Sequence, residues 1–136
     1  MNAGELTLKK DYEVPAFAAD FRGMIKFYYL CDWLFDAASE HARSLGWGYG
    51  DLKKHKMYWV LSRFHAIMRH YPGMHEHITL ETWPRGISGP FALRDFRLSS
   101  GKDTVICLAT TAWLIMDAER GRPERQPVFR AFVKWN

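Results

Sequence analysis

The sequence predicts an α+β domain in which an antiparallel sheet wraps around one long helix. One stretch, residues 20–46, carries apolar side chains at the three- and four-residue spacing of a long amphipathic helix. The segments that follow it alternate apolar and polar residues and are separated by turn residues, as is typical of antiparallel strands. The chain has 136 residues, of which 48% are hydrophobic, and this is enough for one core. We therefore expect residues 1–136 to form a single domain.

The helix is expected to follow a short turn at Asp20 and to end before Gly46, because glycine readily adopts the left-handed conformation found at helix ends. Its buried face is predicted from six apolar positions: Phe27, Cys31, Leu34, Ala38, Ala42 and Leu45. Its solvent face is predicted from four charged positions: Asp32, Asp36, Glu40 and Arg43. His41 lies on or beside the buried face, where we expect a hydrogen-bonded structural residue.

Strands are predicted at residues 5–14, 57–70, 75–83, 91–98 and 104–116, with a short final strand at 128–135. Loops are predicted at residues 47–56, 84–90 and 117–125. Residues 104–116 are apolar on both faces, which predicts an interior position in the sheet. Regular alternation in the second strand predicts that Ser62, Phe64 and Met68 face the helix and that Trp59 faces away from it.

The charge pattern leaves two interpretations open. The net charge is +4, and basic residues gather in two clusters. These are Lys53, Lys54, His55 and Lys56, and Arg120, Arg122, Arg125 and Arg130. Each cluster is either solvated loop charge or a surface that steers an anionic partner, such as an acidic carrier protein or a pyrophosphate. The aromatic residues do not interleave with these clusters, so we expect no nucleic-acid partner.

The chain is expected to work in the cytoplasm, without a membrane, a metal or a cofactor. The longest nearly apolar run, residues 105–116, is shorter than the ~18–20 residues that span a bilayer, and the N-terminus lacks the core of a signal peptide. Cys31 and Cys107 both lie in apolar settings that suit reduced core residues. His75 and His77 share a strand face, but no third ligand is spaced to complete a metal site.

Short motifs along the chain follow an order typical of one family. They are Ala37-Ala38 and His41-Ala42, the run Trp59-Val60-Leu61-Ser62-Arg63, Tyr71-Pro72, Glu81-Thr82-Trp83, Arg94-Asp95-Phe96, and Ala112-Trp113 through Asp117. As an ordered set they resemble the first hotdog domain of acyl-acyl carrier protein thioesterases, over roughly residues 12–127. The resemblance implies a hotdog fold, an antiparallel sheet around one central helix, and the hydrolysis of fatty acyl thioesters.

The same resemblance leaves the catalytic residues unassigned. Members of that family carry two fused hotdog domains, and their catalytic carboxylate, asparagine and histidine form an Asp-x-Asn-x-His pattern in the second. No such pattern occurs in these 136 residues. Single hotdog domains usually pair symmetrically, so we expect a homodimer or a dimer of dimers with the site at the interface between copies.

Asp20 is the candidate catalytic residue. It precedes Gly23 by three positions, as in the Asp-x-x-Gly turn that holds the catalytic aspartate of single-domain hydroxybenzoyl-CoA-type thioesterases. A carboxylate there would act as nucleophile or general base, and the backbone amides of Gly23 and Met24 would stabilise the oxyanion at the helix N-terminus. The alternative is that Asp20 only caps the helix. The histidine or asparagine usually found shortly after the glycine is missing, since Lys26, Phe27 and Tyr28 stand there.

The substrate's acyl chain is expected to lie in a slot between helix and sheet. The predicted contacts are Ser62, Phe27, Tyr28, Cys31, Phe64 and Met68. Ser62 would either touch the thioester or serve as a small residue that lets the sheet approach the helix, and the other side chains equally suit an ordinary core.

The predicted function is hydrolysis of fatty acyl thioesters of acyl carrier protein or coenzyme A. Two alternatives stay open. One is a non-catalytic acyl-binding or regulatory module. The other is a hydratase or dehydratase on the same fold, which is the weaker alternative because those enzymes depend on a histidine that the Asp20 turn does not offer.

Overall fold

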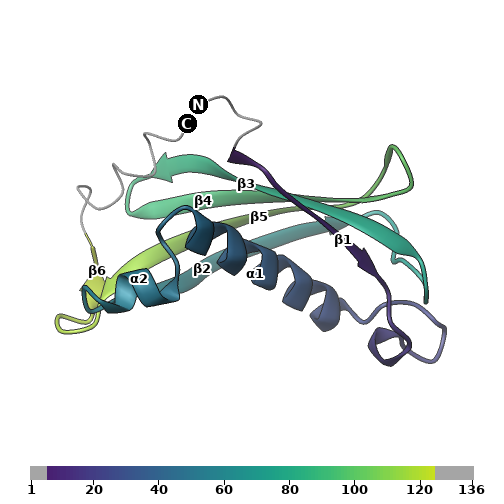
Figure 1. Cartoon of the computed structure of the whole chain (residues 1–136), viewed down its shortest axis with the longest axis horizontal. Coiled ribbons are helices and arrows are strands. Elements are labelled where there is room, and N and C mark those ends of the chain that lie inside the picture. Colours follow the sequence, from purple (N-terminus) through teal and green to yellow (C-terminus); the bar gives the residue numbers. More distant parts are fainter. Residues whose placement is uncertain (1–5, 125–136) are drawn as a thin grey trace.

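The computed structural model describes residues 6–124 as one curled sheet with a long helix against it (Figure 1). The elements are β1 (Leu8–Glu13), a 3-10 turn η2 (Ala16–Ala18), α1 (Phe27–Ser44), α2 (Tyr49–Lys53), β2 (Met57–Met68), β3 (His77–Ser88), β4 (Phe91–Ser100), β5 (Thr104–Asp117) and β6 (Arg122–Pro123). The final strand predicted at residues 128–135 lies outside the described residues. The described part of the chain has no helix that is long and apolar enough to cross a membrane.

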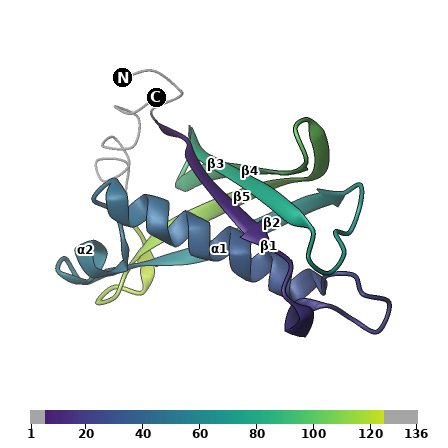
Figure 2. The same ribbon diagram turned by 45° about the vertical axis from the view of Figure 1, so that its right-hand side comes forward.

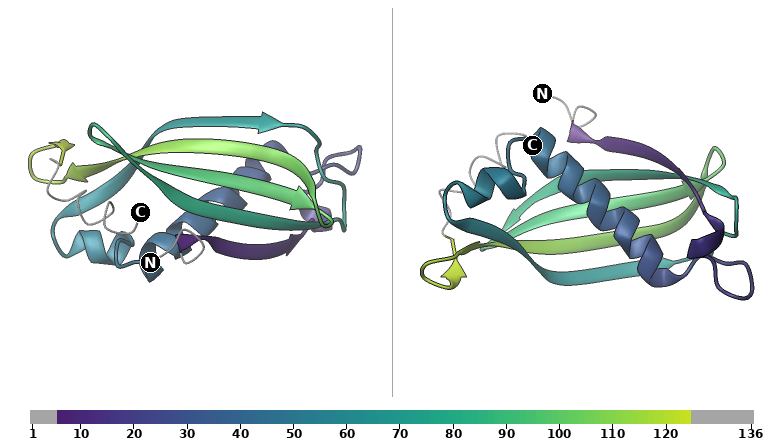
Figure 3. Two further views of the ribbon diagram at one scale, coloured as in Figure 1. Left: turned by 90° about the horizontal axis from the view of Figure 1, so that it is seen from above. Right: turned by 60° about the horizontal axis from the view of Figure 1, so that its bottom comes forward.

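The sheet is antiparallel and has the strand order β1-β3-β4-β5-β2, with the short β6 paired to β5. The helix α1 crosses one face of the sheet diagonally (Figure 2). The two outer strands, β1 and β2, lie on either side of α1 when the molecule is seen from the helix side (Figure 3, right). This arrangement confirms the predicted hotdog-like α+β fold and the interior position of β5.

The buried stripe of α1 is rotated from the predicted one. Leu34 and Ala38 are buried as expected, but Phe27 is 40% exposed and Cys31 only half-buried. The rest of the stripe consists of Leu30, Trp33, Ala37 and His41. The rotation places the larger apolar side chains of the helix against the sheet, where burial removes the most apolar surface from water. Asp32 and Asp36 on the opposite face are exposed, as predicted.

The end of α1 lies where the sequence predicts it, whereas its start lies further along the chain than predicted. The helix begins at Phe27, seven residues after Asp20, because residues 20–26 form a separate turn. At its end, Gly46 has φ +86°, the Gly46 amide donates to the Arg43 carbonyl, and the Trp47 amide donates to the Ala42 carbonyl. This is the Schellman pattern, and it confirms the predicted stop.

A β-bulge at Ser62 changes which residues of β2 face the helix. Leu61 pairs with Trp113 and Arg63 with Ala112, so Ser62 is the extra residue between two consecutive pairs. A bulge shifts the alternation of a strand by one position. Phe64 and Met68 pack on the core as predicted, whereas Ser62 is exposed and Trp59 packs on the inner side. The predicted orientations of Ser62 and Trp59 are therefore wrong.

Two predicted loops contain regular structure. Residues 49–53 form the short helix α2, whose Leu52 is 1% exposed and packs with Ile115. The strand β3 continues through Pro84 to Ser88, with an irregularity between Pro84 and Gly86. Pro84 lies beyond Thr82, where the pairing with β1 ends, and beside the irregularity in the pairing with β4, which is the kind of position where a strand tolerates proline.

Replacing Gly48 by alanine should lower the free energy of unfolding by about 1–3 kcal/mol, the usual range for overpacking. A Cβ atom on Gly48 would lie 2.8 Å from the Cα atom of Arg43, which is backbone and has little freedom to move. Gly50→Ala is the matched control. Its Cβ would meet nothing within 4 Å, and alanine favours a helix, so the stability should stay the same or rise. Urea denaturation of both variants tests this, and equal stabilities would contradict the packing argument.

Candidate functional site

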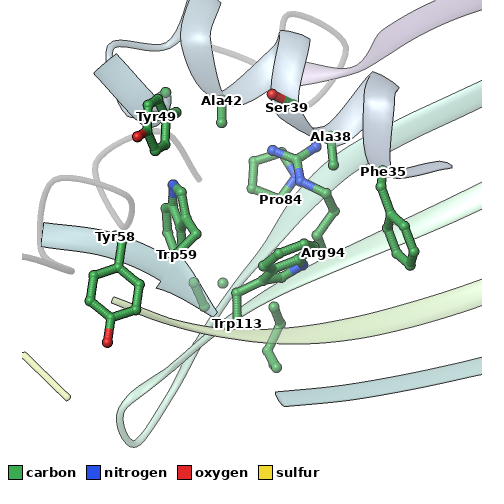
Figure 4. A pocket seen from close by; sticks show the side chains of 14 residues that line it. Phe35, Ala38, Ser39, Ala42, Tyr49, Tyr58, Trp59, Pro84, Arg94 and Trp113 are labelled. Carbon is green, nitrogen blue, oxygen red and sulfur yellow. The ribbon is translucent and has the colours of Figure 1, made fainter. Parts of the chain in front are cut away.

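A cavity of about 370 Å³ lies between α1 and the sheet, at the end of the domain that carries α2 (Figure 4). The residues that line it come from α1, the turn before α2, α2 itself, and strands β2 to β5. They are Phe35, Ala38, Ser39, Ala42, Gly48, Tyr49, Tyr58, Trp59, Pro84, Gly86, Ala92, Leu93, Arg94 and Trp113. A concave, largely apolar site of this size is suited to a small organic ligand.

The walls of the cavity are aromatic. The rings of Trp59 and Trp113 lie 6.4 Å apart between centroids, and Phe35 lies 6.3 Å from Trp113. Both indole N–H groups already have acceptors, because Trp59 donates to the Trp47 carbonyl at 2.8 Å and Trp113 to the Thr111 hydroxyl at 2.8 Å. With these donors satisfied, the rings offer mainly apolar surface to a ligand.

Arg94 is the one strongly polar side chain among the lining residues. It is 7% exposed, and its side chain extends from β4 toward α1 (Figure 4). Nη1 donates to the Thr82 hydroxyl at 3.1 Å and lies 2.9 Å from Nδ1 of His41. Burial lowers the pKa of Arg94 to about 10, which leaves the guanidinium charged at neutral pH.

His41 is a neutral acceptor in this cluster. It is 4% exposed, and burial, together with the nearby charge of Arg94, lowers the pKa of His41 to about 4. Because a charged guanidinium only donates, Nδ1 of His41 must accept and its proton must sit on Nε2. This confirms the predicted structural role of His41, and it ties α1 to β3 and β4 through a single arginine.

Asp20 closes a turn at the opposite end of α1. Its carboxylate accepts from the amides of Arg22 at 2.8 Å and Met24 at 3.2 Å, and from Nη2 of Arg22 at 3.0 Å. Partial burial raises the pKa of Asp20, but the hydrogen bonds from Arg22 and Met24 outweigh it and hold the pKa below its usual value. The carboxylate is therefore ionised at neutral pH, but four donor atoms already surround it.

The two amides that were predicted to form the oxyanion hole have acceptors within this turn. The Gly23 amide donates to the Asp20 carbonyl at 2.9 Å, and the Met24 amide donates to the Asp20 carboxylate. These amides belong to the turn and not to the first turn of the helix, which begins further along the chain at Phe27. The simple capping alternative is also wrong, since Lys26 is the N-cap residue of α1.

None of the six residues predicted to contact the acyl chain is in the lining of the cavity. Tyr28 is 63% exposed. Phe64 lies 6.3 Å from Phe27 and 5.6 Å from Phe35 between ring centroids, so Phe27 and Phe64 continue a row of rings that leads to the cavity wall. Cys31 and Met68 are half-buried, and Ser62 sits at the exposed bulge. Within residues 6–124, no group of three or more His, Cys, Asp or Glu side chains is placed to hold a metal.

Sequence reasoning missed Arg94 and Trp59. A signal for Arg94 was present, because Ala92, Arg94, Phe96 and Leu98 occupy alternate positions of β4 and all four are buried. An arginine on an otherwise apolar strand face is unusual and marks a polar site in the core. No comparable signal existed for Trp59, since its orientation depends on the bulge at Ser62.

Comparison with known proteins places this geometry in a family. Residues 5–128 match the family model of the acyl-ACP thioesterase N-terminal domain. No curated protein matches the sequence.

Three solved structures illustrate the similarity of fold. The acyl-ACP thioesterase from Bacteroides thetaiotaomicron has a TM-score of 0.88 at 23% identity, with 93% of this chain and 52% of that chain covered. The 12:0-ACP thioesterase from Umbellularia californica has a TM-score of 0.80 at 21% identity, with 90% of this chain and 47% of that chain covered. The DHNA-CoA thioesterase from Staphylococcus aureus has a TM-score of 0.82 at 16% identity, with 95% of this chain and 90% of that chain covered. The chain thus spans about half the length of the first two proteins and nearly all of the third.

Stability should fall as the pH falls from about 6.5 to about 4, and His41 should be a major cause. The folded state holds His41 neutral down to about pH 4, whereas the unfolded chain protonates it near 6.5, so the unfolded state binds more protons in this window. At ~1.4 kcal/mol per pKa unit, the loss is on the order of 3 kcal/mol.

The variant His41→Gln keeps an acceptor for Arg94 and removes the titration, so its unfolding free energy should change much less between these pH values. His65→Gln, at an exposed histidine of β2, serves as the control and should retain the wild-type slope. Urea denaturation at a series of pH values measures both. Parallel curves for wild type and His41→Gln would contradict this assignment.

Proposed function

This chain belongs to the family of acyl-ACP thioesterase N-terminal domains, and we propose that it binds the acyl group of a thioester in the cavity between α1 and the sheet and takes part in hydrolysis of that thioester. The observation that carries the proposal is the cavity itself, an apolar space lined by Phe35, Trp59 and Trp113. Each methylene group that leaves water for such a site contributes ~0.8 kcal/mol, so a fatty acyl chain is a favourable occupant.

The rim of the cavity supports a carrier-bound substrate. Tyr49 on α2 lines the cavity and is 68% exposed, and Nζ of Lys53 lies 5.8 Å from the centre of its ring. Lys53 belongs to the first of the two basic clusters and lies beside this exposed residue of the lining. A positive charge there would attract the phosphate of a phosphopantetheine arm, which both acyl carrier protein and coenzyme A carry.

A second copy of the domain would complete the site. In the described chain β2 is an outer strand of the sheet, paired on one side only by β5. Pairing of two β2 edges would join two sheets through backbone hydrogen bonds and cover both open edges. We propose a homodimer of this kind, with Asp20 of one copy or the other as the nucleophile or general base.

One observation favours a second candidate function, an acyl-binding module without turnover. Asp20 does not line the cavity, and its oxygens already accept hydrogen bonds from Arg22 and Met24. A carboxylate engaged in this way stabilises the turn without any catalytic role. By contrast, nothing in the described chain favours a hydratase, because no histidine is among the hydrogen-bond partners of Asp20.

Filling the cavity should shorten the acyl chain that the protein accepts. Ala42 lines the cavity from α1, and Ala42→Phe places a ring in the space. We expect kcat/KM for the longest acyl-CoA substrates to fall by at least ~10-fold, the effect of a misfit of about one methylene group, while short chains are retained. Asp32→Phe, on the exposed face of α1, is the control and should leave the chain-length profile unchanged.

Asp20→Asn should reduce the hydrolysis of acyl-CoA and acyl-ACP by ~10²–10⁴-fold if Asp20 supplies the base or nucleophile. Thiol release from a panel of acyl thioesters measures this, and Asp36→Asn provides a control at an exposed carboxylate of the same domain. Full activity of Asp20→Asn would remove Asp20 from the chemistry. Bound lipid without turnover in the wild type would establish the second candidate.

A further inference from the structure

The cavity holds a buried positive charge that the described residues do not neutralise. Both hydrogen bonds of the Arg94 guanidinium involve Nη1, and both end on uncharged groups, the His41 ring and the Thr82 hydroxyl. Four other arginines pair with a carboxylate: Arg22 with Asp20, Arg85 with Asp95, Arg97 with Glu81 and Arg120 with Asp117. Within residues 6–124, no aspartate or glutamate forms an ion pair with Arg94.

The acidic residue next to Arg94 in the chain and an acidic residue on the neighbouring strand both pair with other arginines. Asp95 is adjacent in the chain, but alternation along β4 sends it to the other face, where it lies 2.9 Å from Nε of Arg85. On the neighbouring strand β3, Glu81 accepts two hydrogen bonds from Nη2 of Arg97. A buried charge without a counter-ion is costly, so its presence beside an apolar cavity calls for a partner from outside the chain.

The unused part of the guanidinium defines the chemistry of that partner. Nε and Nη2 make no hydrogen bond with another described residue, and together they form the flat fork that binds a carboxylate through two parallel bonds. The remaining walls are apolar, with the rings of Phe35, Trp59 and Trp113. A ligand that fits both features is a hydrocarbon chain with a carboxylate at one end.

We propose that this cavity binds a carbon chain that ends in a carboxylate, with the carboxylate on Arg94 and the chain along Phe35, Trp59 and Trp113. The inference rests on the proposed function and narrows its ligand. Two sources share this chemistry. One is the free fatty acid that thioester hydrolysis releases. The other is an acyl thioester that carries a second carboxylate at the far end of its chain.

The experiment compares ligands that differ only at the chain end, using calorimetry and the fluorescence change of the cavity tryptophans. On the full-length chain at pH 8, decanoate should bind at least ~10-fold more tightly than 1-decanol, as expected for hydrogen bonds to a charged group. A second pair, decanedioyl-CoA and decanoyl-CoA, separates the two sources. A preference for decanedioyl-CoA assigns the carboxylate to the substrate, and a preference for decanoate alone assigns it to the product.

Variants test whether Arg94 is the group responsible. Arg94→Met keeps the length of the side chain and removes the charge, so the preference for decanoate should fall to about equal affinity for acid and alcohol. Arg94→Lys keeps the charge without the fork and should retain part of the preference. Arg85→Met, which removes an arginine from the other face of the sheet, should bind as the wild type does. Thermal melts of each variant report whether the fold is intact.

Equal binding of decanoate and 1-decanol by the wild type would overturn the inference while leaving chain binding, and so the proposed function, in place. The same holds if folded Arg94→Met keeps the full preference for decanoate, because the carboxylate would then bind elsewhere. Failure of every chain-bearing ligand to bind would overturn both proposals.

Discussion

Burial of one stripe of α1 against the curled sheet is the interaction on which the rest of the structure depends. In the first half of the helix the stripe consists of large side chains, Leu30, Trp33 and Leu34, which fill the space above the sheet. In the second half it changes to alanine, and Ala38 and Ala42 line the cavity. Protein interiors are close-packed and contain few empty spaces of this size. The cavity exists because the helix changes from large to small residues along its length.

The same change in residue size explains the polar bridge. Beside the small residues of α1, Arg94 reaches from β4 to His41 and Thr82. One guanidinium thus connects the helix with two strands. A buried charge is rarely the most stable solution for a core, so we regard this bridge as part of the binding site as well as part of the fold.

Local features carry the resemblance of this chain to its family, and geometry limits what can be transferred. The match over residues 5–128 and the fold agree. However, the acidic turn at Asp20 and the cavity lie at opposite ends of α1, so one copy of the domain does not bring a carboxylate to the cavity. Chemistry on a chain held in the cavity would therefore need a carboxylate that does not line the cavity.

The sequence by itself determined the class of fold, the single long helix with its stop at Gly46, the interior position of β5 and the structural role of His41. Each of these depends on a periodic pattern or a local conformational preference, which a sequence displays directly. The tertiary structure alone decided which residues form the site. The bulge at Ser62 turns Trp59 inward, the turn at Asp20 consumes the amides of Gly23 and Met24, and strand pairing leaves Arg94 without a counter-ion. These are properties of contacts between distant segments, and no pattern within one segment records them.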